Sequence, residues 1–172
     1  TIDKFVGDAI LIFFGDPETK GDKEDAYSCV LMALEMQERM HHLKNLWEDQ
    51  GITNPLEIRI GINTGYCNVG NFGSENRLDY TIIGGEVNLA SRLESNAMTG
   101  QILISQETYA LIKKHIVCEK KDEIKVKGIA HKIQTYQVVG SYKNIAQKRK
   151  ILNEKFDGFN LNIDLNLSLI HI

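Results

Sequence analysis

Three residues could take part in metal or phosphoryl chemistry because of their type and position: Asp8, Asn88 and Arg92. Asp8 stands between two apolar runs in KFVGDAILIFF, at a Gly-Asp pair that is typical of a two-residue hairpin turn. A turn carboxylate needs no function. A hairpin would nevertheless hold the carboxylate rigidly, and hard cations such as Mg²⁺ take oxygen ligands of this kind. Local chemistry leaves both interpretations of Asp8 open.

The stretch VNLASRLES places Asn88 and Arg92 four residues apart, on one face of a predicted helix. Such a pair is most often solvated surface. It would also aim an amide and a guanidinium at one point, and guanidinium is suited to planar phosphoryl groups. The glycines of GYCNVGNF have the spacing of a phosphate loop, but Asn71 stands where lysine is required. We therefore interpret these glycines as turn residues.

Several elements must position these side chains. Residues 1–15 predict a β-hairpin, and apolar residues at three- and four-residue steps predict a long helix over 23–49. Further along, the patterns predict a strand over 56–63, a strand pair over 64–85, a helix over 85–97, a strand over 101–105, a helix over 106–115, and strands over 123–128 and 133–140. This order predicts an α+β domain, with helices packed on a largely antiparallel sheet.

Composition excludes several classes of protein. The chain has 172 residues, enough for one domain with a real core. Its net charge of −3 gives no bulk attraction to nucleic acid or to an anionic membrane. The longest apolar run, AILIFF, is far shorter than the ~20 residues of a membrane span. The cysteines are widely spaced and form no CxxC, which indicates a reducing compartment without a disulfide framework.

Three separated stretches together resemble the catalytic domain of class III nucleotidyl cyclases, the adenylyl and guanylyl cyclases. They are DKFVGDAILIFFG, RIGINTGYCNVGNFGSENRLDYTIIGGEVNLASRLES and VKGIAHKIQTYQVVG, in family order. The resemblance covers residues 1–140, and we predict a C-terminal tail over 141–172. The ending of the tail, LSLIHI, resembles translated sequencing adaptor. The implied fold is a ferredoxin-like βαββαβ core with extra strands.

The resemblance implies roles for individual residues. In the family, two aspartates hold two divalent cations, Mg²⁺ or Mn²⁺, and Asp8 is similar to the second of them. Asn88 and Arg92 match the pair that acts on the transition state, with Arg92 at the α-phosphate and Asn88 orienting the ribose. Lys127 matches a lysine that contacts the triphosphate.

Base choice in the family depends on two positions, which match Lys4 and Thr81. Lysine with threonine resembles the adenine-selecting pair of a bacterial-type subgroup. A lysine ammonium can donate to adenine N1, and a threonine hydroxyl can accept from the exocyclic amine. Some members with the threonine variant respond to bicarbonate, so bicarbonate is a candidate regulator.

The resemblance implies an adenylate cyclase that converts ATP to 3′,5′-cyclic AMP and pyrophosphate. Its active sites would form between the two protomers of a homodimer. One protomer would supply the metal aspartates, and the other would supply the Asn, the Arg and the base-reading pair. We expect a cytoplasmic domain with no nucleic-acid partner, linked to a membrane only through segments outside this chain. A guanylate cyclase and a non-catalytic cyclase-homology domain are the alternatives.

The chain departs from the family pattern in two places. The first metal aspartate belongs to an opening strand that precedes the position of Thr1 in the family, so the fold is expected to lack its first strand here. We therefore predict that the 172-residue polypeptide is inactive alone. In addition, Gly85 and Glu86 stand where many members have Gly-Asp. This change leaves the Asn and the Arg in place.

Overall fold

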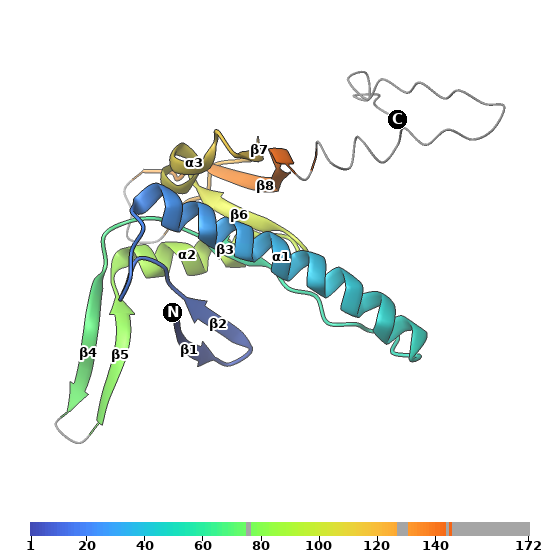
Figure 1. Ribbon diagram of the computed structural model, residues 1–172, viewed down its shortest axis with the longest axis horizontal. Helices are drawn as coiled ribbons and strands as arrows, with labels where there is room; N and C mark the ends of the chain where they lie inside the picture. The colour runs from blue at the N-terminus through green and yellow to red at the C-terminus, as the bar shows by residue number, and fades with distance from the viewer. Residues whose placement is uncertain (75–76, 127–130, 144, 146–172) are drawn as a thin grey trace.

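The computed structural model describes residues 1–74, 77–126, 131–143 and 145. Helices and strands are interspersed along these residues (Figure 1). In chain order they are β1 (Ile2–Val6), β2 (Ala9–Ile12), α1 (Asp22–Asp49), β3 (Ile60–Ile62), β4 (Asn68–Ser74), β5 (Arg77–Ile83), α2 (Gly85–Asn96), β6 (Ile102–Ser105), α3 (Gln106–Ile112), β7 (Ile116–Lys120) and β8 (Thr135–Ser141).

A four-stranded sheet in the order β3-β6-β8-β7 forms the centre of the fold. β3 and β6 are parallel, which requires a long crossover connection, and α2 lies within that connection. β8 pairs antiparallel with both β6 and β7. The mixed α+β class predicted from the sequence is confirmed.

Strand β6 is buried on both faces and separates two apolar clusters. Ile102 and Ile104 belong to one cluster with Val30 of α1, whereas Leu103 belongs to the other with Leu93 of α2. Neighbouring side chains of a strand point to opposite faces, so α1 and α2 cover opposite sides of the sheet. Helix α3 joins the α1 side through its own buried residues. The domain therefore has three layers, with the sheet in the middle.

Two hairpins lie outside this sheet. β1 pairs with β2, and β4 pairs with β5, each as a separate two-stranded antiparallel sheet. Both extend below the helices in the view of Figure 1. The β1–β2 hairpin confirms the element predicted for residues 1–15.

The structure differs from the sequence prediction at three strands. The strand predicted over 56–63 is shortened to β3, because its pairing with β6 involves only Ile60–Ile62. The described part of 123–128 forms no strand, and Ile124 makes one isolated bridge to Ile133. The sequence analysis also missed β7, whose short sequence IVCEK follows a helix without a turn signal of Gly or Pro between them.

Helix α1 matches its predicted bounds closely but is packed over only part of its length. Its buried residues are Ala26, Val30 and Ala33, all in the first half. Beyond them the helix extends past the sheet, and Leu46 is exposed (Figure 1). Most of the tail predicted over 141–172 lies outside the described residues.

Candidate active site

Asp8 lies at the tip of the β1–β2 hairpin. Val6 pairs with Ala9, so Gly7 and Asp8 form a two-residue loop. Gly7 has a φ of 64°, and no described residue other than glycine has a positive φ. A glycine at the first loop position, followed by a residue of negative φ, is the pattern of a type II′ turn. The turn presents Asp8 at an exposed position.

Lys4 and Thr81 lie close together, joined by a residue that the sequence analysis did not single out. The Thr81 hydroxyl donates to Oδ2 of Asp3 at 2.9 Å. The Lys4 ammonium lies 3.7 Å from the same oxygen. Strand β1 contacts β5, which brings Asp3 and Thr81 together although they are 78 positions apart in sequence. The two residues predicted to read the base therefore share one carboxylate.

Asn88 and Arg92 lie on the exposed face of α2. The buried side of the helix carries Leu89 and Leu93, which pack against the sheet. This division follows from the 3.6-residue period of the helix. Within the part of the chain that the structure describes, neither the Asn88 amide nor the Arg92 guanidinium has a side-chain partner. Both groups are therefore available to a ligand.

Helix α2 is seated against β3 by a glycine. A Cβ atom added at Gly61 would lie 2.2 Å from the backbone nitrogen of Glu94 and 2.3 Å from the carbonyl oxygen of Ala90. Any side chain at this position would push the helix away from the strand. Gly61 thus allows the close approach that fixes the place of Asn88 and Arg92 relative to the sheet.

Glu86 fixes the beginning of the same helix. Its carboxylate accepts a hydrogen bond from the Asn63 amide at 2.7 Å, and its backbone carbonyl accepts from the same amide at 3.2 Å. Burial, and then the charge of Glu86, raises the pKa of the nearby Cys67 thiol. The departure from the family pattern at Glu86 therefore ties α2 to the end of β3. The sequence analysis missed this contact, because the two residues are 23 positions apart.

The described residues offer part of a metal site. Asp8 has no side-chain partner among them, and they contain no cluster of three or more His, Cys, Asp or Glu side chains that could hold a metal. Mg²⁺ is usually held by one or two carboxylates together with substrate phosphates. A free carboxylate in a rigid turn fits that requirement as one ligand. No hydrogen bond or ion pair between described residues joins Asp8 to Asn88 or Arg92, and Lys127 lies outside the described residues.

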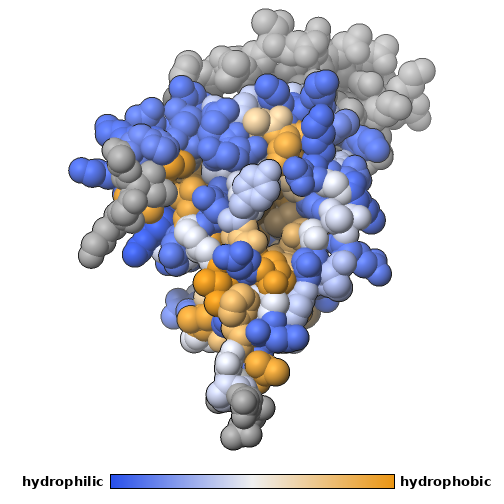
Figure 2. All heavy atoms as spheres, turned by 90° about the vertical axis from the view of Figure 1, so that its left-hand side faces the viewer, coloured by the Kyte–Doolittle hydropathy of each residue, from blue (hydrophilic) through white to orange (hydrophobic). Residues whose placement is uncertain are grey.

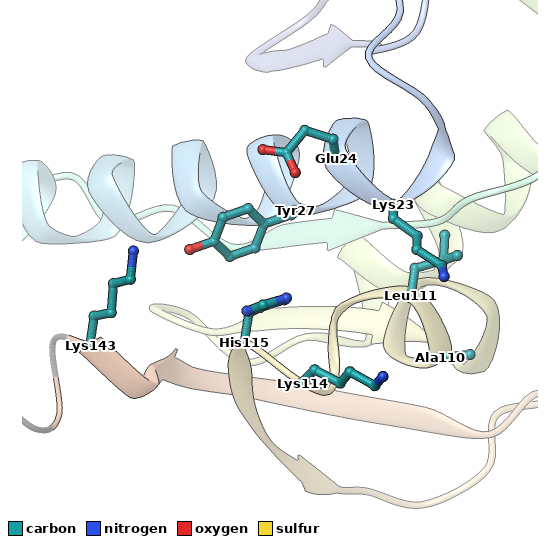
Figure 3. Close-up of a pocket in the computed structure, with 8 residues that line it drawn as sticks. All are labelled: Lys23, Glu24, Tyr27, Ala110, Leu111, Lys114, His115 and Lys143. Atoms are coloured by element: carbon teal, nitrogen blue, oxygen red, sulfur yellow. The ribbon is translucent and has the colours of Figure 1, made fainter.

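A pocket of about 260 Å³ lies elsewhere, between α1 and α3. Figure 3 shows Lys23, Tyr27 and His115 among its lining residues, and none of the predicted site residues lines it. Lys4, Asp8, Asn88 and Arg92 are instead exposed on the surface of the single chain, on α2 and on the β1–β2 hairpin. Thr81, on β5, is buried.

Comparison with known proteins identifies the family. The family described as the adenylate and guanylate cyclase catalytic domain matches residues 3–140. The chain belongs to this family. The resemblance noted in the sequence is thereby confirmed. No helix among the described residues is long and apolar enough to cross a membrane.

Solved structures and curated relatives include both kinds of cyclase. The chain is 60% identical to the adenylyl cyclase CyaB from P. aeruginosa, with a TM-score of 0.80, over 83% of this chain and 73% of that one. It is 37% identical to the guanylyl cyclase Cya2, with a TM-score of 0.75, over 82% and 70%. A Dictyostelium discoideum adenylate cyclase, described as specific to terminal differentiation, is 35% identical over 80% of this chain. The chain spans only 6% of that relative.

Proposed function

We propose that the protein is an adenylate cyclase, which converts ATP to 3′,5′-cyclic AMP and pyrophosphate in the cytoplasm. The observation that carries the proposal is the pair Asn88 and Arg92, which share the exposed face of a closely packed helix without side-chain partners in the described residues. The 60% identity to an adenylyl cyclase supports ATP as the substrate.

In the proposed reaction, the ribose 3′-oxygen attacks the α-phosphorus in line. The bond from the α-phosphorus to the oxygen that bridges to the β-phosphate breaks, and the 3′-hydroxyl loses its proton. Arg92 would stabilise the negative charge that grows on the α-phosphate oxygens, and Asn88 would orient the ribose. Lys127 would contact the triphosphate. These contributions are mainly positioning and charge stabilisation, as is usual for phosphoryl transfer.

Asp8 would be one carboxylate ligand of the two divalent cations, Mg²⁺ or Mn²⁺. When bound, such ions lower the pKa of the attacking hydroxyl and neutralise the leaving pyrophosphate. The type II′ turn suits this role because it holds the carboxylate in a fixed place, with no competing partner in the described residues. Lys4 and Thr81 would bind the adenine, with Lys4 donating to N1 and Thr81 accepting from the exocyclic amine.

We further propose that two copies of the chain form the site together. Apolar side chains gather over the lower part of the face in Figure 2, where the β4–β5 hairpin extends. Large exposed apolar patches mark interaction sites. In the homodimer, Asp8 of one copy would face Asn88 and Arg92 of the other. The exposed apolar residues of the two hairpins include Ile2, Phe5, Val6, Ile10, Leu78, Tyr80 and Ile83.

The proposal is tested by an assay of the intact gene product with ATP and with GTP, in Mg²⁺ or Mn²⁺. Cyclic AMP from ATP, reduced by about 10²–10³-fold in the Arg92→Ala variant, is the expected result. Preferred turnover of GTP would instead support a guanylate cyclase, the second candidate, which the similarity to Cya2 favours. No product from either nucleotide, with the dimer intact, would indicate a non-catalytic domain. The same assay on the 172-residue chain tests the prediction that it is inactive alone.

A further inference from the structure

Asp3 places a deeply buried carboxylate between the two base-reading residues. Its side chain is 1% exposed, whereas that of Lys4 is 46% exposed. One oxygen, Oδ2, accepts the hydrogen bond from the Thr81 hydroxyl and is also the oxygen paired with the Lys4 ammonium. Burying a carboxylate is costly unless it is hydrogen-bonded and paired, and Asp3 meets both conditions.

A backbone irregularity accounts for the position of Asp3. The β1–β2 register shifts between Ile2, which pairs with Ile12, and Lys4, which pairs with Leu11. Asp3 is thus the extra residue of a β-bulge. A bulge bends the strand and re-aims a side chain, so neighbouring residues need not point to opposite faces. The bulge explains how the side chains of two consecutive residues, Asp3 and Lys4, approach each other.

The hydrogen bond to Asp3 determines whether the Thr81 hydroxyl donates to the base or accepts from it. A threonine hydroxyl can both donate and accept, so alone it would suit either an amine or a carbonyl on the purine. An ionised carboxylate only accepts. Because the Thr81 hydrogen is directed to Asp3, only lone pairs remain for the base. Adenine presents an amine donor at its exocyclic position, whereas guanine presents a carbonyl acceptor.

We propose that Asp3 is a positioning residue that makes the site select adenine over guanine, acting through Thr81. This inference rests on the proposed cyclase function. The Asp3 carboxylate holds the Thr81 hydroxyl as an acceptor toward the base. A guanine carbonyl would meet the Thr81 lone pairs, and a mismatch of this kind leaves polar groups unpaired and gives discrimination between substrates.

The test is the Asp3→Asn substitution in the intact gene product, read as the ratio of kcat/KM for ATP to kcat/KM for GTP. The introduced amide can donate to the Thr81 oxygen, which frees the hydroxyl hydrogen for a guanine carbonyl. We expect the ATP-to-GTP ratio to fall by about tenfold, the size expected for one hydrogen bond. Asp49→Asn, at the exposed C-terminal end of α1, is the matched control and should leave the ratio unchanged.

The same substitution made in a protein that lacks the Thr81 hydroxyl shows whether Asp3 acts through Thr81. In a Thr81→Val protein the hydroxyl is absent, so adding Asp3→Asn should leave the remaining ATP-to-GTP ratio unchanged. Equilibrium binding of ATP and GTP analogues that lack the 3′-hydroxyl, and so cannot cyclise, gives the same comparison for a variant with slow turnover. An unchanged ratio in the single variant, or an equal fall with and without the Thr81 hydroxyl, would overturn the inference. Lack of cyclase activity in the unchanged protein would contradict the proposed function, whereas the binding ratio would still test Asp3.

Discussion

Helix α2 carries Asn88 and Arg92, the β1–β2 hairpin carries Asp8, and the structure holds these two elements in different ways. α2 lies across the sheet with Leu93 fully buried, and Gly61 lets its backbone approach β3 closely. The hairpin stands outside the central sheet, and the Phe5 side chain on β1 is 70% exposed. The half of the site with the Asn-Arg pair is thus fixed by the core of one chain, whereas the half with Asp8 is presented outward.

The hairpin is attached to the rest of the domain at a few points. Phe13, just after β2, is buried and packs near Tyr80, with ring centroids 6.4 Å apart. Asp3 adds its hydrogen bond to Thr81. Both contacts join the hairpin to β5 rather than to the central sheet. A position on the core suits groups that must be held rigidly around one substrate, while an outward hairpin suits a group that is shared with a second copy.

The largest expected change in stability distinguishes α2 from the β1–β2 hairpin directly. Leu93→Ala removes a fully buried side chain from the cluster beneath α2 and should lower the free energy of unfolding by roughly 2–5 kcal/mol. Phe5→Ala removes an exposed side chain and should change the free energy of unfolding of the monomer by no more than about 0.5 kcal/mol.

Urea denaturation at high dilution measures both variants as monomers, and sedimentation measures their self-association. Phe5→Ala should weaken dimer formation, because its side chain belongs to the exposed apolar surface of the hairpins. Equal losses of monomer stability in the two variants would show that the hairpin is as firmly packed as α2.

A smaller loss of stability should follow when the contact between α2 and β3 is disrupted. Gly61→Ala places a Cβ atom against the backbone of Glu94 and Ala90, so we expect a loss of roughly 1–3 kcal/mol in the free energy of unfolding. Gly85→Ala is the control at the first position of α2, where an added Cβ meets nothing within 4 Å. It should change stability by no more than about 1 kcal/mol, in the stabilising direction. Similar losses in both variants, measured by urea denaturation, would contradict the close seating of α2.

Local features of the site could be predicted from the sequence, and distant contacts could not. The Gly-Asp turn and the four-residue spacing of Asn88 and Arg92 were readable because short-range geometry fixes them. The bulge at Asp3 was not, because the register shift depends on pairing with β2 and on the contact with β5. Likewise, nothing near Glu86 in the sequence indicates that its carboxylate binds Asn63.

The bounds of two strands were predicted wrongly for a related reason. A pattern such as that of 56–63 or 123–128 indicates which segments could be extended, but a strand exists only where a neighbour pairs with it. β6 offers partners only to Ile60–Ile62 of the first segment, and Ile124 finds a single bridge. Fold class depends on the order of elements and so tolerates these errors, which is why the α+β class was predicted correctly.

The most direct test of the account is to mix two inactive variants of the intact gene product, Asp8→Asn and Arg92→Ala. If each active site takes Asp8 from one copy and Arg92 from the other, every mixed dimer contains one site with both residues intact. Random exchange of equal amounts should then restore about one quarter of the wild-type rate of cyclic AMP formation. Each variant alone should stay inactive. No recovery in a mixture whose subunits demonstrably exchange would contradict a site shared between two copies.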